Sequence, residues 1–202
     1  MLEFSRGSLR SLWVLLVAAL LAPMASEGQD LHPSRRPSPM GMARVEIGDT
    51  FVSVVYSRPY KRNRDNIFGT EESGALVPFG KIWRTGANEA TQFTTTRDIL
   101  VAGQKLPAGT YSLFTTPGEK EWSVHFNKNL MMWGEMGRNP ETGKFEPAYD
   151  AANNALTVTV PVGSSEEEVD QFTILLKDAE GGADLVFSWI KTEVHVPIAA
   201  AS

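Results

Sequence analysis

The chain has 202 residues, a length typical of one domain with a short removable segment, and its 24 acidic and 19 basic residues give a net charge of −5. This acidity argues against nucleic acid as the main partner, because neutralising phosphates requires clustered lysine and arginine. The absence of cysteine excludes disulfides, thiolate nucleophiles, iron–sulfur centres, cysteine-ligated zinc and the lipid-attachment cysteine of bacterial lipoproteins.

Residues 1–28 have the pattern of a secretory signal peptide. Arg6 and Arg10 form a basic start, residues 12–21 are an apolar run too short to span a bilayer, and small side chains follow within residues 25–28. We therefore expect Sec-type export to the periplasm or the extracellular space, with no lipid anchor and no stable membrane span after cleavage. An uncleaved N-terminal anchor is the alternative.

The next segment, residues 29–43, is rich in proline and contains almost nothing to bury, which predicts an extended linker. Its paired Arg35 and Arg36 are expected to be solvated, with a processing or contact site as the alternative. A single folded domain is expected over residues 44–198, followed by a short tail at 199–202. After loss of the signal peptide, a chain of about 170 residues can bury about two thirds of its unfolded surface.

The folded region has the alternation and the turn spacing of short β-strands. Glycine, proline, asparagine and aspartate separate most of the strands, and Lys191-Thr192 separates the last two. The strands are expected at residues 44–47, 50–57, 91–96, 99–101, 110–115, 121–127, 156–160, 172–176, 185–190 and 194–198. Residues 65–74 are expected to form a loop, residues 129–150 a long loop with at most one helical turn, and residues 163–169 a solvated acidic turn. About ten strands without helical periodicity predict an all-β, antiparallel sandwich of jelly-roll type, with a barrel as the alternative.

A first polar cluster follows the strand at 50–57. Pro59 forces the backbone out of the ladder, which places Arg58 at a sheet end, and Arg58 and Arg64 belong to a run with four basic residues in seven. Arginine recognises carboxylate or phosphate with a planar fork, so the run predicts an anion-binding loop. The alternative is a solvated basic loop in which Arg58 pairs with an internal acid such as Glu89.

A second cluster, Trp83, Arg84, Asn88 and Glu89, lies within seven residues before the strand at 91–96. The indole offers a stacking face, the guanidinium a charge, the amide a donor and an acceptor, and the carboxylate a general base if it is desolvated. The alternative is an internal network of arginine, glutamate and asparagine that fixes a loop over the core.

Catalytic and metal-binding signals are sparse. His125 lies on the polar face of a predicted strand, His195 lies near the C-terminus, and no histidine pair has metal-ligand spacing, so no metal or cofactor is expected. Ser57 lacks the flanking glycines of a nucleophile elbow. A hydrolase that uses Glu89 or His125 as its base is therefore an alternative without a motif to support it.

Several motifs in chain order support a family resemblance. They are Y-S-R-P (56–59), I-F-G (67–69), L-V-P-F-G-K-I-W-R-T-G-A-N-E-A-T (76–91), L-P-A-G-T-Y-S-L-F-T-T-P (106–117) and W-S-V-H-F-N-K (122–128). With these motifs the chain resembles the bacterial domain-of-unknown-function family 2911 from about residue 44 to residue 198. The resemblance implies a secreted or periplasmic bacterial protein, sometimes fused to helical repeats, and it implies no established activity or functional residue. Residues 70–73 are extra length relative to that family.

The sequence thus favours a non-enzymatic module that binds a polar or anionic ligand of the cell envelope, such as a glycan or a peptide. Trp83 or Trp133 would stack on this ligand, and the residues expected to hold it are Arg58, Arg64, Arg84, Asn88 and Glu89. A structural envelope domain, whose polar motifs only tie loops to the core, is a further alternative beside the hydrolase. Nothing in the sequence indicates an oligomeric state.

Overall fold

The computed structural model describes residues 35–130 and 132–201, so the expected signal peptide and the first part of the expected linker lie outside the described residues. Its elements are β1 (Met40–Ile47), β2 (Thr50–Ser57), β3 (Phe68–Gly69), β4 (Val77–Pro78), β5 (Thr91–Thr95), β6 (Ile99–Val101), β7 (Gln104–Leu106), β8 (Gly109–Thr116), β9 (Glu121–Asn127), β10 (Met132–Trp133), β11 (Met136–Arg138), β12 (Phe145–Pro147), the 3₁₀ helix η2 (Ala151–Asn153), β13 (Asn154–Ala179) and β14 (Gly182–Ala200). Within these ranges there is no α-helix, and no helix is long and apolar enough to cross a bilayer.

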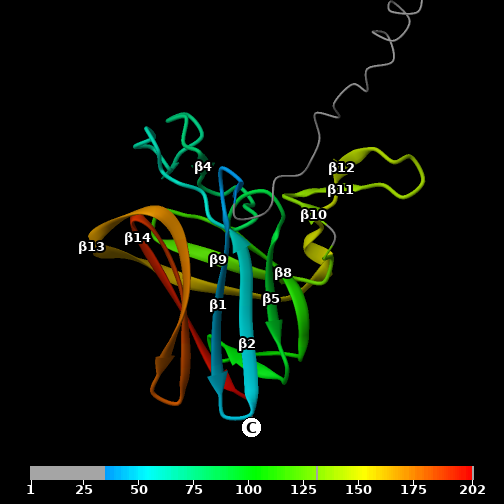
Figure 1. Cartoon of the computed structure of the whole chain (residues 1–202), viewed down its shortest axis with the longest axis vertical. Helices are drawn as coiled ribbons and strands as arrows, with labels where there is room; N and C mark the ends of the chain where they lie inside the picture. Colours follow the sequence, from blue (N-terminus) through cyan, green and yellow to red (C-terminus); the bar gives the residue numbers. More distant parts are fainter. Residues whose placement is uncertain (1–34, 131, 202) are drawn as a thin grey trace, which may run out of the picture. The chain divides into compact units, whose positions relative to one another are not determined.

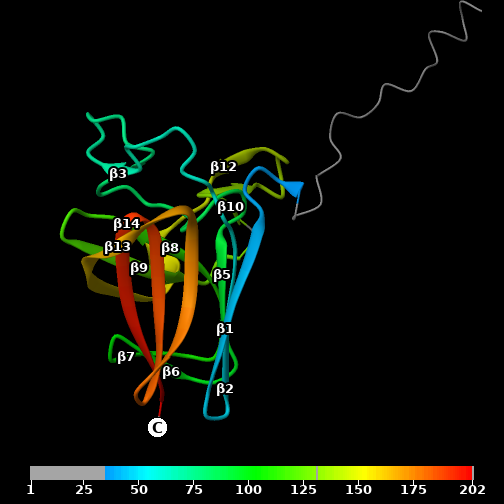
Figure 2. The same cartoon turned by 60° about the vertical axis from the view of Figure 1, so that its left-hand side comes forward.

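The expected all-β, mostly antiparallel sandwich is confirmed, and the sheets do not close into a barrel. Nine strands form one continuous sheet in the order β1-β2-β5-β8-β9-β13-β14-β6-β7, which folds over into two layers (Figures 1 and 2). The first part of β13 pairs with β9 and its later part with β14, with register shifts between Ser164 and Thr173 where the strand arches over. These two long strands therefore connect the layers.

Several boundaries differ from the expected ones. Strand β1 begins at Met40, inside the expected linker, because Met40 through Ala43 pair in register with the second half of β2. Strand β14 extends to Ala200, and the acidic segment 163–169 lies within β13, although its glutamates are exposed as expected. The expected long loop 129–150 instead contains β10, β11 and β12, which form a small three-stranded sheet. Strands of two or three residues are too short to show alternation in the sequence.

The core lies between the two layers and is built from the alternating apolar positions of the strands. In β9, for example, Trp122, Val124 and Phe126 are buried, as the alternation predicts. At one end of the sandwich the core becomes an aromatic cluster in which the rings of Phe68, Trp83, Trp122, Phe172 and Trp189 are in mutual contact. This cluster lies beneath the loops that carry the predicted site residues.

Two irregular segments lie at that same end of the sandwich. The chain from the end of β2 through β3 and β4 forms one of them, and the small sheet β10-β11-β12 forms the other (Figures 1 and 2). Both segments project from the end opposite the C-terminus, and together they line the hollows described below.

Candidate functional site

The loop that follows Trp83 is closed tightly against the end of β2. Trp83 forms an isolated antiparallel bridge with Thr115, and the N–H of Thr91 donates to the carbonyl of Arg84 at 3.2 Å. Gly86 lies so close to β2 that a Cβ in its place would be 2.8 Å from the carbonyl oxygen of Ser57. A side chain at this position would displace the loop, so the glycine lets the site loop pack on the sheet.

Trp83 is a core residue, with only 8% of its surface exposed. Its Nε1 donates to the carbonyl of Gly86 at 3.0 Å, and its ring stacks on that of Trp189 with an angle of 16° between the planes. Phe68 and Phe172 also contact the ring. Little of the Trp83 ring is free to stack on a ligand, because the aromatic cluster contacts it, and Trp83 nevertheless lines a pocket described below.

Arg84 leaves the core beside Trp83, and its guanidinium lies on the backbone of Gly134, in the turn between β10 and β11. A Cβ on Gly134 would be 2.1 Å from Nη1 of Arg84. The Nε of Arg84 is fully buried and has no hydrogen-bond partner, and no ion pair or hydrogen bond to the guanidinium exists among the described residues. The alternative of an internal network that links Arg84 to Glu89 is not found among the described residues.

Arg84 lines a hollow of about 630 Å³, which we call the basic pocket. Residues from the β3 and β4 segment form one wall, and Glu135 lies on the side of the small sheet. The charged side chains that line it are Arg62, Arg64, Glu71, Lys81, Arg84 and Glu135. Lys81 pairs with Glu71 at 2.9 Å. The remaining charges leave the pocket electropositive in a protein whose overall charge is negative.

The two arginines of the first cluster have different surroundings. Arg64 lines the basic pocket and donates through Nη2 to the carbonyl of Tyr60 at 2.6 Å. Arg58 lines neither this pocket nor the next one, and it donates instead to the carbonyl of Phe172 at 3.3 Å and to Oγ1 of Thr173 at 2.9 Å. It thereby ties the end of β2 to β13, and the expected alternative of a pair between Arg58 and Glu89 is wrong.

Glu89 belongs to a separate polar cluster. Its Oε1 accepts from Nη1 of Arg36 at 2.5 Å, and its Oε2 lies 3.5 Å from Oγ of Ser57. Asn88 donates to that same Oγ at 3.1 Å and to the carbonyl of Ser38 at 3.3 Å. Partial burial raises the pKa of Glu89, but the hydrogen bond and charge of Arg36, with smaller contributions from its own backbone and Ser57, outweigh it and lower the pKa. The carboxylate is therefore ionised at neutral pH and is a weak base.

Glu89 lines a second hollow of about 510 Å³, which we call the apolar pocket. It lies between the start of β1, the start of β5 and the small sheet, and it contains Trp133, whose side chain is well exposed. The predicted site residues are thus divided between two places. Arg64, Trp83 and Arg84 line the basic pocket, Glu89 lines the apolar pocket, and Arg58 and Asn88 line neither.

Neither histidine of the sheets joins these pockets. The ring nitrogens of His125 bond to the hydroxyls of Thr116 at 2.9 Å and Thr157 at 3.1 Å, and burial lowers its pKa. His125 therefore has no carboxylate partner among the described residues and does not meet Glu89. Within the described ranges, no group of three or more acidic or histidine side chains is arranged to hold a metal ion.

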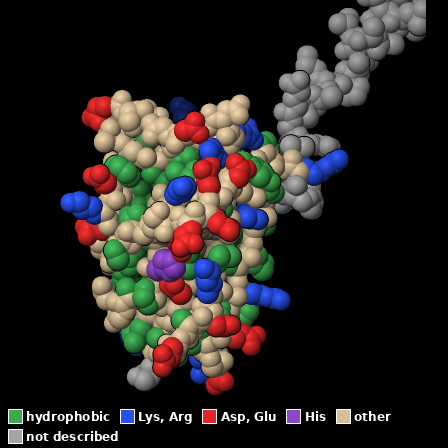
Figure 3. All heavy atoms as spheres, turned by 90° about the vertical axis from the view of Figure 1, so that its left-hand side faces the viewer, with side chains coloured by type: hydrophobic (Ala, Val, Ile, Leu, Met, Phe, Trp, Pro, Cys, Tyr) green, Lys and Arg blue, Asp and Glu red, His purple; other side chains and the backbone are tan. Residues whose placement is uncertain are grey.

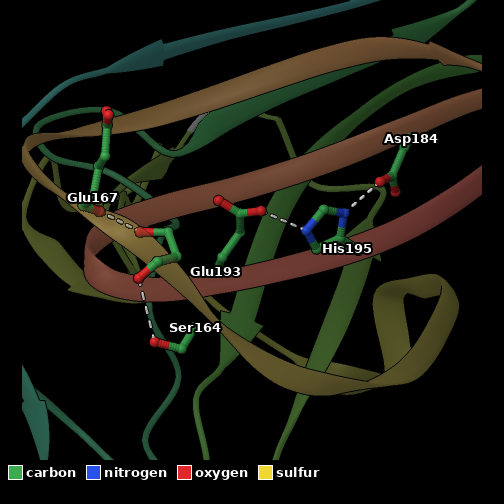
Figure 4. Close-up of polar contacts among 6 residues, drawn as sticks. Ser164, Glu167, Asp184, Glu193 and His195 are labelled. Atoms are coloured by element: carbon green, nitrogen blue, oxygen red, sulfur yellow. Dashed lines mark hydrogen bonds and ion pairs between the residues drawn. The ribbon is translucent and has the colours of Figure 1, made fainter.

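His195 lies on the outer face of the β13 and β14 layer, where charged side chains of both signs are interspersed (Figure 3). Because β14 doubles back near Ile190, whose φ is 52°, the Nδ1 of His195 contacts the carboxylate of Asp184. Nε2 lies 2.7 Å from Oε1 of Glu193, and Figure 4 shows the ring held between the two carboxylates. Partial burial lowers the pKa of His195, but the hydrogen bonds to both carboxylates outweigh it and raise the pKa.

The sequence does not predict the role of Arg36 in these sites. A proline-rich segment predicts a solvated arginine, whereas Arg36 pairs with Glu89. Trp133 is among the residues expected to contact a ligand, and the segment 129–150 that carries it, expected as a long loop, forms the small sheet beside the apolar pocket. Contacts between segments more than fifty residues apart carry no local sequence pattern.

The comparisons with known proteins identify a family. The family model described as "Protein of unknown function (DUF2911)" matches residues 38–198. The chain belongs to this family. Neither the search of curated proteins nor the search of solved structures found a match. The DUF2911 region contains every residue that lines the basic and apolar pockets, whereas Arg36 lies before it.

Proposed function

We propose that this DUF2911 domain is a non-enzymatic module that binds a small polar ligand, carrying a carboxylate or a phosphate, in the basic pocket. The observation that carries the proposal is the guanidinium of Arg84, which is partly buried and has no partner among the described residues. A cationic group removed from water costs free energy unless an anion or an acceptor replaces the lost hydration. A bound carboxylate or phosphate would supply that partner in bidentate geometry.

The rest of the pocket supports an anion. Arg62 and Arg64 use some of their N–H groups to bond backbone carbonyls, which orients the side chains without neutralising their charge. The four basic side chains of the lining outnumber its two acidic ones. Glu71 pairs with Lys81 and Glu135 offsets one further charge, so the pocket keeps an excess of positive charge. A hollow of about 630 Å³ is within the usual size of pockets for small ligands.

The compartment expected from residues 1–28 suggests the ligand class. If the chain is exported to the periplasm or beyond, acidic glycans and peptides of the cell envelope are the anions it meets there. The export itself is a prediction from the sequence. The ligand class therefore rests on the pocket charge, and its envelope origin rests on the predicted signal peptide.

The two alternatives fit the geometry less well. A hydrolase would need Glu89 or His125 as a base near a nucleophile in a common pocket. Glu89 is paired with Arg36, and the ring nitrogens of His125 bond to threonine hydroxyls in the part of the chain that the structure describes. A purely structural role accounts for Arg58 and Asn88, whose hydrogen bonds join loops to the sheets. It leaves the unpartnered Arg84 unexplained.

Thermal unfolding against a panel of sugar phosphates, uronic acids and acidic peptides tests the proposal. A ligand at one hundred times its Kd adds about 2.7 kcal/mol to the free energy of unfolding, which raises the Tm measurably. We expect Arg84→Gln to abolish the shift while the exposed control Arg97→Gln, with the same loss of charge, keeps it. If no compound of the panel raises the Tm of the wild-type protein, or if a compound raises the Tm of wild type and Arg84→Gln equally, an anion site at Arg84 is contradicted.

A further inference from the structure

The apolar pocket carries an inference that does not depend on the basic pocket. Four large hydrophobic side chains around it, Met40, Leu130, Trp133 and Phe145, are between 36% and 54% exposed. Apolar side chains are normally scattered singly over a protein surface, and their concentration around one hollow marks a binding surface. Two of the four are aromatic, and both are carried by the small sheet.

Polar side chains with unused hydrogen-bonding capacity lie in the same hollow. Oε1 of Glu89 is occupied by Arg36, but the contact of Oε2 with Ser57 is long, at 3.5 Å. The amide of Gln92, on the exposed face of β5, makes no hydrogen bond within the described ranges. Arg138 lies 5.2 Å from the centre of the Phe145 ring and donates through Nη1 to a backbone carbonyl, which fixes the ring and guanidinium together.

The charges of the pocket restrict the ligand. Glu89 and Arg138 line the pocket with opposite charges, and Glu89 is also matched by Arg36, so a cation would find no uncompensated carboxylate. Arg138 is exposed to water, so its charge does not require a bound anion. A hydrocarbon chain would remove Glu89 and Gln92 from water without replacing their hydrogen bonds, which costs free energy. The pocket therefore suits a neutral molecule with apolar faces and several hydroxyls.

We infer that the apolar pocket binds a neutral saccharide. The C–H faces of a sugar ring pack on Trp133 and Phe145, while its hydroxyls donate to Oε2 of Glu89 and exchange hydrogen bonds with the amide of Gln92. A hydroxyl is both donor and acceptor, so it satisfies a carboxylate and an amide equally well. In this arrangement the small sheet supplies the aromatic side chains and β5 supplies Gln92. Figure 1 shows the small sheet β10-β11-β12 beside the end of the main sheet.

Isothermal titration of the purified protein with neutral oligosaccharides, namely cellotetraose, maltotetraose and tri-N-acetylchitotriose, tests the inference. We expect saturable binding of at least one of them. Trp133→Ala is expected to weaken it by about tenfold or more, because loss of an aromatic anchor removes a large share of the contact. Gln92→Leu, at an exposed strand position where the fold tolerates substitution, should weaken it by several-fold.

Two controls make the result specific. Phe51→Ala removes an exposed aromatic ring outside the pocket and should leave the sugar affinity unchanged. Arg64→Gln, which removes a charge from the basic pocket away from the small sheet, should also leave it unchanged, so that failure of the anion site and failure of the sugar site are distinguishable. Absence of saturable binding by all three sugars at 10 mM, binding that survives both Trp133→Ala and Gln92→Leu, or displacement of the sugar by a hydrophobic peptide of higher affinity would overturn the inference.

Discussion

The guanidinium of Arg84 lies on the backbone of Gly134, where a Cβ would come within 2.1 Å of Nη1. The two residues are fifty positions apart, and this contact joins the site loop to the turn between β10 and β11. It also determines where the small sheet lies relative to Arg84. Arg84 and Glu135, the residue that follows Gly134, both line the basic pocket.

We first predict that Gly134→Ala destabilises the fold by about 1–3 kcal/mol, because a side chain at a φ of 66° is strained and because it displaces the end of the Arg84 side chain. Gly143→Ala is the matched control, since its φ is 68° and its nearest neighbour is 3.8 Å away. The difference between the two should shrink in an Arg84→Ala background. Urea denaturation measures the free energy of unfolding of each variant. Equal decreases in Gly134→Ala and Gly143→Ala would show that Arg84 does not lie on this turn.

A second prediction concerns Tyr56, whose hydroxyl accepts from the N–H of Ile174 at 2.7 Å and donates to its carbonyl at 3.2 Å. Tyr56→Phe should cost about 1–3 kcal/mol, because it leaves two buried backbone groups without a partner. The exposed Tyr60→Phe is the control and should change the free energy of unfolding by less than about 0.5 kcal/mol. Similar values for the two variants would contradict this bridge between the layers.

The pair of Glu89 with Arg36 should make stability depend on acid pH. Because the folded state lowers the pKa of Glu89, its stabilising contribution is present above the usual glutamate pKa of 4.5 and is lost as the pH falls through the lower folded value. Denaturation of wild type and Glu89→Gln at pH 7 and at pH values below 4.5 should therefore show a difference that shrinks as the pH falls. An Arg36→Gln background should reduce that difference at pH 7, and a difference independent of pH would argue against the ion pair.

The two sheet histidines should titrate in opposite directions. The folded state raises the pKa of His195, so its contribution to stability is full below 6.5 and is lost as the pH rises through the higher folded value. Burial gives His125 a pKa below 6.5. NMR titration of the imidazole protons, assigned with His125→Gln and His195→Gln, should find one midpoint on each side of 6.5. A midpoint above 6.5 for His125, or one below 6.5 for His195, would contradict the environment of that histidine.

The sequence alone was sufficient for the family, the all-β class and most of the longer strands. The alternation in β9 and the pairing of β1 with β2 are visible as local patterns in the sequence. Successive side chains of a strand point to opposite faces of the sheet, so buried and exposed residues alternate along the chain. The concentration of arginine, tryptophan and asparagine also indicated which loops border the hollows. These features depend on neighbours in the chain, which are visible before folding.

Tertiary structure alone decided how those residues are used. Arg84 and Glu89 are close in sequence, yet they line different pockets, because the loop between them turns through Gly86 and Asn88. Trp83 is part of the core because its ring packs against those of Phe172 and Trp189. Glu89 forms an ion pair with Arg36, which precedes β1. Such partners are brought together by sheet pairing across long sequence separations, so no local pattern of residues specifies them.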